Sequence, residues 1–208
     1  MHEKKIALFD MDSSLADYES ALIRDLNLIA APNEPTITNL WEAEKAPHMK
    51  YRMRMIKNQP NWWLNLDLIP MGVEVFSISR AYGFDCQILT KGPNFLGAAW
   101  KEKFEWAKKH LGDVVVTITG GCPDEGRIDQ YKSNVYGHFF YDDYTYYMEG
   151  WLNARKRGIG IMPVTNQNKD FKHPRVLKYD GNVKQLKQVL ERISVRQPNE
   201  TITLDNLD

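Results

Sequence analysis

The stretch KIALFDMDSS, residues 5–14, decides the fold, because a short apolar run ends there abruptly in two aspartates. An apolar run of this length with a polar end is typical of a buried strand. The residues that follow, Ser14–Ile29, carry apolar side chains three or four positions apart, which predicts one face of a helix. Ser13 or Ser14 is the expected N-cap of that helix.

The alternation of strand and helix returns after residue 70. Helices are expected over Met71–Tyr82, Asn94–Leu111, Thr145–Arg157 and Asn182–Ile193. Strands are expected over Asp85–Thr90, Val114–Thr119, His138–Asp143, Gly158–Thr165 and Val176–Tyr179. Strands that alternate with helices of this length favour a parallel sheet covered on both faces. We therefore predict an α/β fold built on a doubly wound, mostly parallel sheet.

Residues 32–70 interrupt this alternation. Pro32 breaks the helical pattern, and the stretch that follows mixes charged and aromatic residues with little strand character. We predict a small helical cap at residues 32–70, inserted after the first helix. The core then comprises residues 1–31 and 71–195, and residues 196–208 form a polar tail that is expected to be loosely held.

Composition and charge exclude several classes of protein. The 208 residues include 27 Lys and Arg against 27 Asp and Glu, so we expect no stable nucleic-acid partner. No apolar run reaches the roughly 18 residues that span a bilayer, and the apolar stretch at the N-terminus is too short for a signal peptide. Cys86 and Cys122 suggest neither a disulfide framework nor a zinc site. We expect a soluble, cytoplasmic protein, with a homodimer as one possible state.

Polar side chains gather at the ends of the expected strands. They are Asp10 and Asp12, Thr90 and Lys91, and Asp142 and Asp143, with Lys132 ten residues before Asp142. Ligands of such sheets bind at the carboxyl ends of the strands, where these groups should meet. Acids with a hydroxyl and an amine suit a hard cation and a phosphate. Taken singly, acids after a strand are as often loop residues or helix N-caps.

In chain order, four segments resemble the four motifs of the haloacid dehalogenase-like (HAD) phosphatases. These are DMDSSLADYES (residues 10–20), ILTKGP (residues 88–93), Lys132, and FFYDD (residues 139–143). Within that superfamily the chain is most similar to the 5′(3′)-deoxyribonucleotidases. The shared features are the opening motif, the aromatic-rich NWWLNLDLIPMG (residues 61–72), KEKFEWAKKHLG (residues 101–112) and the spacing from Lys132 to the acid pair. The resemblance covers roughly residues 5–145.

The resemblance implies a phosphoryl-transfer reaction. Asp10 would attack phosphorus to form an aspartyl-phosphate. Asp12 would protonate the departing alcohol and then activate the water that hydrolyses the intermediate. Mg²⁺ would be held by the Asp10 carboxylate, the Asp12 backbone carbonyl and Asp143, with Asp142 in support.

The resemblance also implies how the substrate is bound. Thr90 would hydrogen-bond the phosphoryl group, and Lys132 would neutralise Asp10 and the phosphate charge. The expected contacts to the rest of the substrate are Tyr18, Trp41, Lys91 and Tyr144. Lys91 and Tyr144 depart from the residues usual in the nucleotidases, and Lys57 falls roughly where a base-stacking Trp is expected. These departures concern the leaving group and therefore the substrate.

Two features of the cap allow a simpler explanation. The basic run at residues 45–57 is more simply a solvated helix face, with a phosphate-binding lid as the alternative. Trp62 and Trp63 are more simply packing between cap and core than a platform for a nucleobase.

The sequence thus predicts a Mg²⁺-dependent phosphomonoesterase whose partner is a small phosphomonoester, first of all a nucleoside monophosphate. One alternative is a HAD phosphatase of another small phosphoester, such as a sugar phosphate. Another is a non-catalytic nucleotide-binding module that keeps the fold. Asp10, Asp12, Lys132 and Asp143 together argue against the last, because a pure binder does not need both acids of the first motif.

Overall fold

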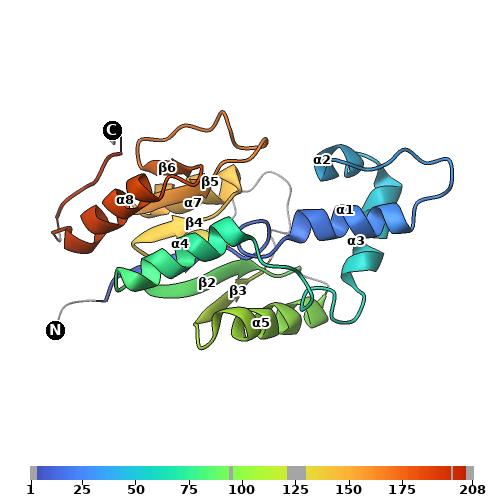
Figure 1. Ribbon diagram of the computed structural model, residues 1–208, viewed down its shortest axis with the longest axis horizontal. Helices are drawn as coiled ribbons and strands as arrows, with labels where there is room; N and C mark the ends of the chain where they lie inside the picture. The colour runs from blue at the N-terminus through green and yellow to red at the C-terminus, as the bar shows by residue number, and fades with distance from the viewer. Residues whose placement is uncertain (1–3, 94–95, 121–129, 198, 205–208) are drawn as a thin grey trace.

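One parallel sheet organises the protein. The computed structural model describes residues 4–93, 96–120, 130–197 and 199–204. Its strands are β1 (Ile6–Phe9), β2 (Asp85–Lys91), β3 (Val116–Thr119), β4 (Phe139–Tyr141), β5 (Ile159–Pro163) and β6 (Val176–Tyr179). They form the order β3-β2-β1-β4-β5-β6, and every described pair is parallel (Figure 1). The predicted α/β fold with a doubly wound sheet is confirmed.

Side chains of β1 alternate between the two faces of the sheet, as the pleat requires. Ala7 and Phe9 enter the larger core cluster, which α4 (Pro70–Ala81), α5 (Gly97–Leu111) and α8 (Val183–Val195) cover. Leu8 enters a second cluster on the opposite face, where it is covered by α7 (Thr145–Ala154). Both faces of this central strand are therefore buried, which explains its continuous apolar sequence.

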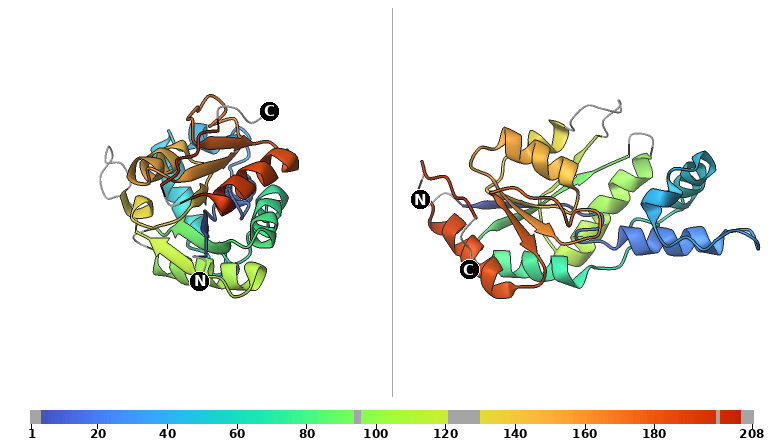
Figure 2. Two further views of the ribbon diagram at one scale, coloured as in Figure 1. Left: turned by 90° about the vertical axis from the view of Figure 1, so that its left-hand side faces the viewer. Right: turned by 90° about the horizontal axis from the view of Figure 1, so that it is seen from above.

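Three helices stand away from the sheet. They are α1 (Tyr18–Leu28), α2 (Leu40–Ala43) and α3 (Pro47–Lys57), and they lie together beyond the carboxyl end of β1 (Figures 1 and 2). A separate apolar cluster joins them, made of Leu22, Leu26, Leu40, Met53 and Ile56. The expected helices at residues 32–70 are thus present, but α1 packs with them rather than on the sheet. The division into two domains stays a prediction, and this packing favours a first boundary near residue 17 instead of 31.

The start of α1 differs from the prediction. The helix begins at Tyr18, and its N-cap is Asp17, whose side chain accepts a hydrogen bond from Ser20 N at 3.2 Å. Ser13 instead has a φ of 57°, and its N–H donates to Ala16 O at 2.8 Å. A left-handed residue and a short-range bond of this kind turn the chain tightly, so neither Ser13 nor Ser14 can cap the helix.

A close backbone approach holds this turn against the core. A Cβ on Gly72 of α4 would lie 2.0 Å from the carbonyl oxygen of Ser14. The glycine therefore allows α4 to pack directly on the loop that follows β1.

The last residues described pack on the core, which corrects the expectation of a loose tail. Ile202 is 1% exposed, and Leu204 N donates to Pro174 O at 2.7 Å. The Arg157 guanidinium donates to Gln197 O at 2.7 Å. The tail is polar in composition, but one buried isoleucine and these backbone bonds are enough to hold it.

None of the described helices combines the length and the apolar character needed to cross a membrane. Cys86 is buried in β2 with a free thiol, whereas Cys122 lies outside the described residues.

Replacing Ile202 by Ala tests the packing of the tail. We expect a loss of about 2–4 kcal/mol in the free energy of unfolding, because a buried isoleucine is truncated to leave a cavity. Urea denaturation measures it, with Thr203→Ala as the control, since Thr203 is exposed. Equal stability of the two variants would show that the tail does not belong to the core.

Candidate active site

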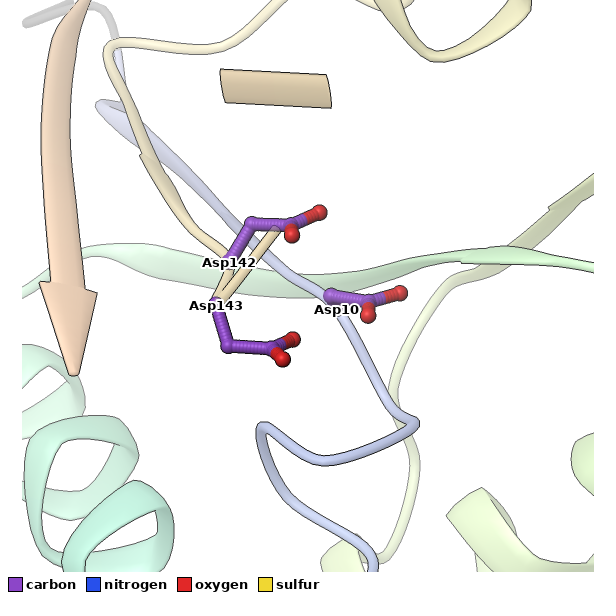
Figure 3. A group of neighbouring side chains, drawn as sticks. All are labelled: Asp10, Asp142 and Asp143. Carbon is purple, nitrogen blue, oxygen red and sulfur yellow. The ribbon is translucent and has the colours of Figure 1, made fainter. Parts of the chain in front are cut away.

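Three carboxylates meet at one edge of the sheet. Asp10 follows β1, and Asp142 and Asp143 follow β4, its neighbour in the sheet. Asp10 N donates to Tyr141 O at 2.8 Å, which brings the two strand ends into register. One oxygen from each aspartate lies within 4.8 Å of the others, and the three carboxyl groups extend to the same side (Figure 3).

Lys132 neutralises part of this charge. It lies in the short helix α6 (Gln130–Ser133) and is fully buried. Its Nζ donates to Asp10 Oδ1 at 2.7 Å and to Asp142 Oδ2 at 2.8 Å. Burial alone would lower the pKa of Lys132, but the two carboxylates outweigh it and raise that pKa above its usual value. Lys132 therefore stays charged and orients both acids.

Asp142 and Asp143 differ in what they face. Asp142 is fully buried, does not line the cavity, and accepts a hydrogen bond from Tyr144 N at 2.8 Å. Burial raises its pKa to about 7, with Lys132 opposing and Asp10 adding to the rise. Asp143 does line the cavity, and Ser14 Oγ lies 3.2 Å from both its Oδ1 and its backbone N.

The donor set fits a hard divalent cation. Burial, Asp142 and Asp10 raise the pKa of Asp143, and Lys132 and the Ser14 hydroxyl only partly oppose this, so ionisation of this carboxyl group is penalised. A cation bound by Asp10 and Asp143 would remove that penalty, and oxygen atoms are the ligands that Mg²⁺ prefers. Asp142, held by Lys132, would support the site without contacting the cavity.

Asp12 has a partner that the sequence did not predict. Lys103 of α5, whose side chain is fully buried, donates from Nζ to Asp12 Oδ2 at 2.6 Å. The other oxygen, Oδ1, is buried and has no hydrogen-bond partner among the described residues. Burial raises the pKa of Asp12 despite the opposing charge of Lys103. Asp12 is therefore fixed through one oxygen, while its side chain, 26% exposed, still lines the cavity.

Lys103 also donates a hydrogen bond to Thr90. The Thr90 hydroxyl is buried, does not line the cavity, and lies 3.2 Å from Lys103 Nζ. Lys103 Nζ also donates to Lys91 O at 2.6 Å. Lys103 thus ties the end of β2 to Asp12. Contact of Thr90 with a phosphoryl group stays a prediction.

The carboxylates open into a cavity of about 650 Å³ between the cap helices and the sheet edge. The residues expected from the sequence that line it are Asp10, Asp12, Tyr18, Trp41, Lys91, Lys132, Asp143 and Tyr144. The structure adds lining residues that were not expected as site residues, among them Glu19, Glu44, Arg54, Lys57, Tyr147 and Gln167. Trp41 is 48% exposed and lies 6.0 Å from Tyr144, ring centre to ring centre.

Trp63 packs between cap and core, as expected. It is 3% exposed, and its ring stacks on Tyr18 at 5.5 Å. Lys103 Nζ lies 4.5 Å from the centre of the Trp63 ring. The basic run at residues 45–57 is not only a solvated face, because Arg54 and Lys57 line the cavity.

Comparison with known proteins adds the fold family. No family model and no curated protein matches the sequence. A candidate β-phosphoglucomutase from Thermotoga maritima superposes with a TM-score of 0.56 at 15% identity, over 90% of this chain and 99% of that chain. A candidate haloacid dehalogenase-like hydrolase from Burkholderia xenovorans LB400 gives 0.50 at 12% identity, over 91% and 96%. The chain therefore has the fold of the HAD-like hydrolases. Nothing in these likenesses singles out the deoxyribonucleotidases.

A double-mutant cycle tests the Asp12–Lys103 pair. Lys103→Met and Asp12→Asn should each lower the free energy of unfolding, because each leaves a charge without its partner. The double variant should lose less than the sum, by at least about 1 kcal/mol. Urea denaturation measures the cycle. The exposed pair Lys108–Asp113 is the control and should show much weaker coupling. Additive losses at Asp12 and Lys103 would contradict the pairing.

Proposed function

We propose that this protein is a Mg²⁺-dependent phosphomonoesterase that works through an aspartyl-phosphate intermediate. One observation carries the proposal: Asp10, bonded to the buried Lys132, and Asp12, bonded to the buried Lys103, both open into the same cavity. Two acids at one strand end, each oriented by its own cation, can divide the roles of nucleophile and acid–base. The HAD-like fold supports this reading.

Asp10 is the proposed nucleophile. Lys132 holds Oδ1 and thereby orients the carboxylate. Attack forms a bond from a carboxylate oxygen to phosphorus, while the bond from phosphorus to the leaving oxygen breaks. The Lys132 ammonium lies beside the reacting group and stabilises negative charge on the phosphoryl oxygens.

Asp12 is the proposed acid and base. Its side chain lines the cavity, its buried Oδ1 has no hydrogen-bond partner among the described residues, and burial favours the protonated form. The protonated Asp12 gives its proton to the departing alkoxide and then takes one from the water that hydrolyses the intermediate. Lys103 keeps the side chain in place through both steps.

The proposed metal-binding groups are the carboxylates of Asp10 and Asp143 and the backbone carbonyl of Asp12, with Asp142 in support; the three carboxylates cluster in the structure. Bound Mg²⁺ supplies positive charge next to the phosphoryl oxygens. Thr90 is the remaining proposed contact of the phosphoryl group, at the end of β2.

A nucleoside monophosphate is the first substrate that we propose. Tyr18, Trp41 and Tyr144 line the cavity, and flat aromatic side chains suit a nucleobase. A sugar phosphate is the second candidate, favoured by the likeness to the candidate β-phosphoglucomutase. Phosphate release from a panel of both compound classes separates the two.

Asp10→Asn tests the nucleophile. We expect no turnover of p-nitrophenyl phosphate in a folded variant, because an amide cannot form the acyl-phosphate. Asp113→Asn, at an exposed position, should keep full activity. Near-normal phosphate release by Asp10→Asn would contradict Asp10 as the nucleophile, whereas no release even by the unaltered protein would favour the non-catalytic binding module.

Removing the metal is a separate test. EDTA should silence phosphate release and Mg²⁺ should restore it, since the site consists of hard oxygen ligands. Asp143→Asn should raise the Mg²⁺ concentration at half-maximal activity by about tenfold or more, because one charged ligand is lost. Full activity in a preparation shown by elemental analysis to be free of metal would contradict the proposal.

A further inference from the structure

Cations other than Lys132 also line the cavity. Arg54 and Lys57 lie three residues apart on α3 and so on one face of the helix, and Lys91 ends β2 in the core. The cavity thus meets positive side chains from the cap and from the core. Apart from the aspartates, the acidic residues among the described lining residues are Glu19 and Glu44, against the three cations Arg54, Lys57 and Lys91.

Lys57 is half-buried without a charged partner. Its Nζ donates to the Tyr18 hydroxyl at 3.2 Å and lies 5.7 Å from the centre of that ring. No carboxylate of the described residues forms an ion pair with it. Burial lowers the pKa of Lys57, and the charge of Glu44 only partly opposes this. A cation held in this way is best stabilised by an anion, and the neutral Tyr18 hydroxyl is not one.

The phosphoryl group that the proposed reaction transfers does not need Arg54, Lys57 or Lys91. Lys132 serves the Asp10 side of the site, and Lys103 is bonded to Asp12, Thr90 and the end of β2. A second cationic set in the same cavity is therefore placed to bind the part of the substrate that leaves.

We propose that the leaving group carries a second anionic group, a phosphate or a carboxylate, which Lys57 and Arg54 of the cap and Lys91 of the core bind. This inference rests on the proposed phosphomonoesterase function and names its substrate class. The preferred substrates are small bisphosphates or phosphorylated carboxylic acids rather than monophosphates without a second anionic group, so among nucleotides a nucleoside bisphosphate is preferred to a nucleoside monophosphate. Each charge-assisted hydrogen bond to the second anion strengthens recognition about tenfold or more.

Matched substrates test the inference. The pairs are fructose 1,6-bisphosphate with fructose 6-phosphate, adenosine 3′,5′-bisphosphate with adenosine 5′-monophosphate, and 3-phosphoglycerate with glycerol 3-phosphate. Phosphate release in the presence of Mg²⁺ gives kcat/KM for each compound. We expect the member with two anionic groups to be favoured by at least about tenfold in one pair or more. Which pairs show the preference then indicates whether the second anionic group is a phosphate or a carboxylate.

Variants show whether the cavity cations cause the preference. Lys57→Met and Lys91→Met should each reduce the ratio of kcat/KM within a favoured pair by about tenfold. Lys50→Met is the matched control, since Lys50 is an exposed cation on α3 that does not line the cavity, and it should keep the ratio. Thermal unfolding checks that each variant folds. If Lys57→Met does not fold, Lys91→Met still tests the inference, because Lys91 is the cation that the core contributes.

The outcomes separate this inference from the proposed function. Turnover of p-nitrophenyl phosphate and of the monophosphates, with no preference in any pair, overturns the second anion site and leaves the phosphomonoesterase standing. A preference that survives both Lys57→Met and Lys91→Met also overturns it. No phosphate release from any of these compounds overturns the phosphomonoesterase itself, and the inference falls with it.

Discussion

The buried contact of Lys132 with Asp10 and Asp142 is the interaction on which the site depends. It joins α6 to the ends of β1 and β4, and all three charged groups are nearly or fully shielded from water. Removing one member of such a buried group costs about 3–5 kcal/mol, because the remaining charges lose their partner. Tyr147 and Phe140 enclose the ammonium, with ring centres at 4.4 and 5.4 Å. The two rings and the two carboxylates therefore restrain Lys132, and Lys132 in turn orients Asp10 and Asp142.

A second anchor links the cap to the same site. Glu102 of α5 accepts hydrogen bonds from Asn61 N at 2.8 Å and Trp63 N at 3.1 Å, in the segment that returns from the cap. Trp106, one turn further along α5, donates to Leu66 O at 2.8 Å. The neighbour of Glu102 is Lys103, which holds Asp12. Two adjacent residues of one helix thus position the segment that returns from the cap and the proposed acid–base group.

The cavity combines the two surfaces that these anchors bring together. Core residues supply the carboxylates and Lys132, whereas the cap contributes Trp41 and Lys57. Apolar contacts among α1, α2 and α3 build the cap as a unit around its own small cluster. The clustered carboxylates therefore come from the core, whereas part of the wall and charge of the cavity comes from the cap.

The sequence by itself determined the sheet and the position of its acids. The alternation of apolar strands with amphipathic helices is a local pattern, so β1, β2 and β4 and the polar residues at their ends could be predicted. Parallel strands place their carboxyl ends at one edge, which brought Asp10, Asp142 and Asp143 together without further information.

Only the tertiary structure decided the partners of these groups. Lys103 lies 91 positions from Asp12. Its spacing of four from Ala99 and Ala107 places it on the buried face of α5, but this local pattern does not say which group it meets there. The partner of Lys57 could not be predicted either, because the local charge pattern assigns this lysine to a solvated face. Nor could the packing of α1, because its apolar face fits a sheet or a cap equally well. Local periodicity states which side of an element is apolar or charged. What that side meets is decided by long-range packing, since contacts between distant segments leave no periodic trace in the chain.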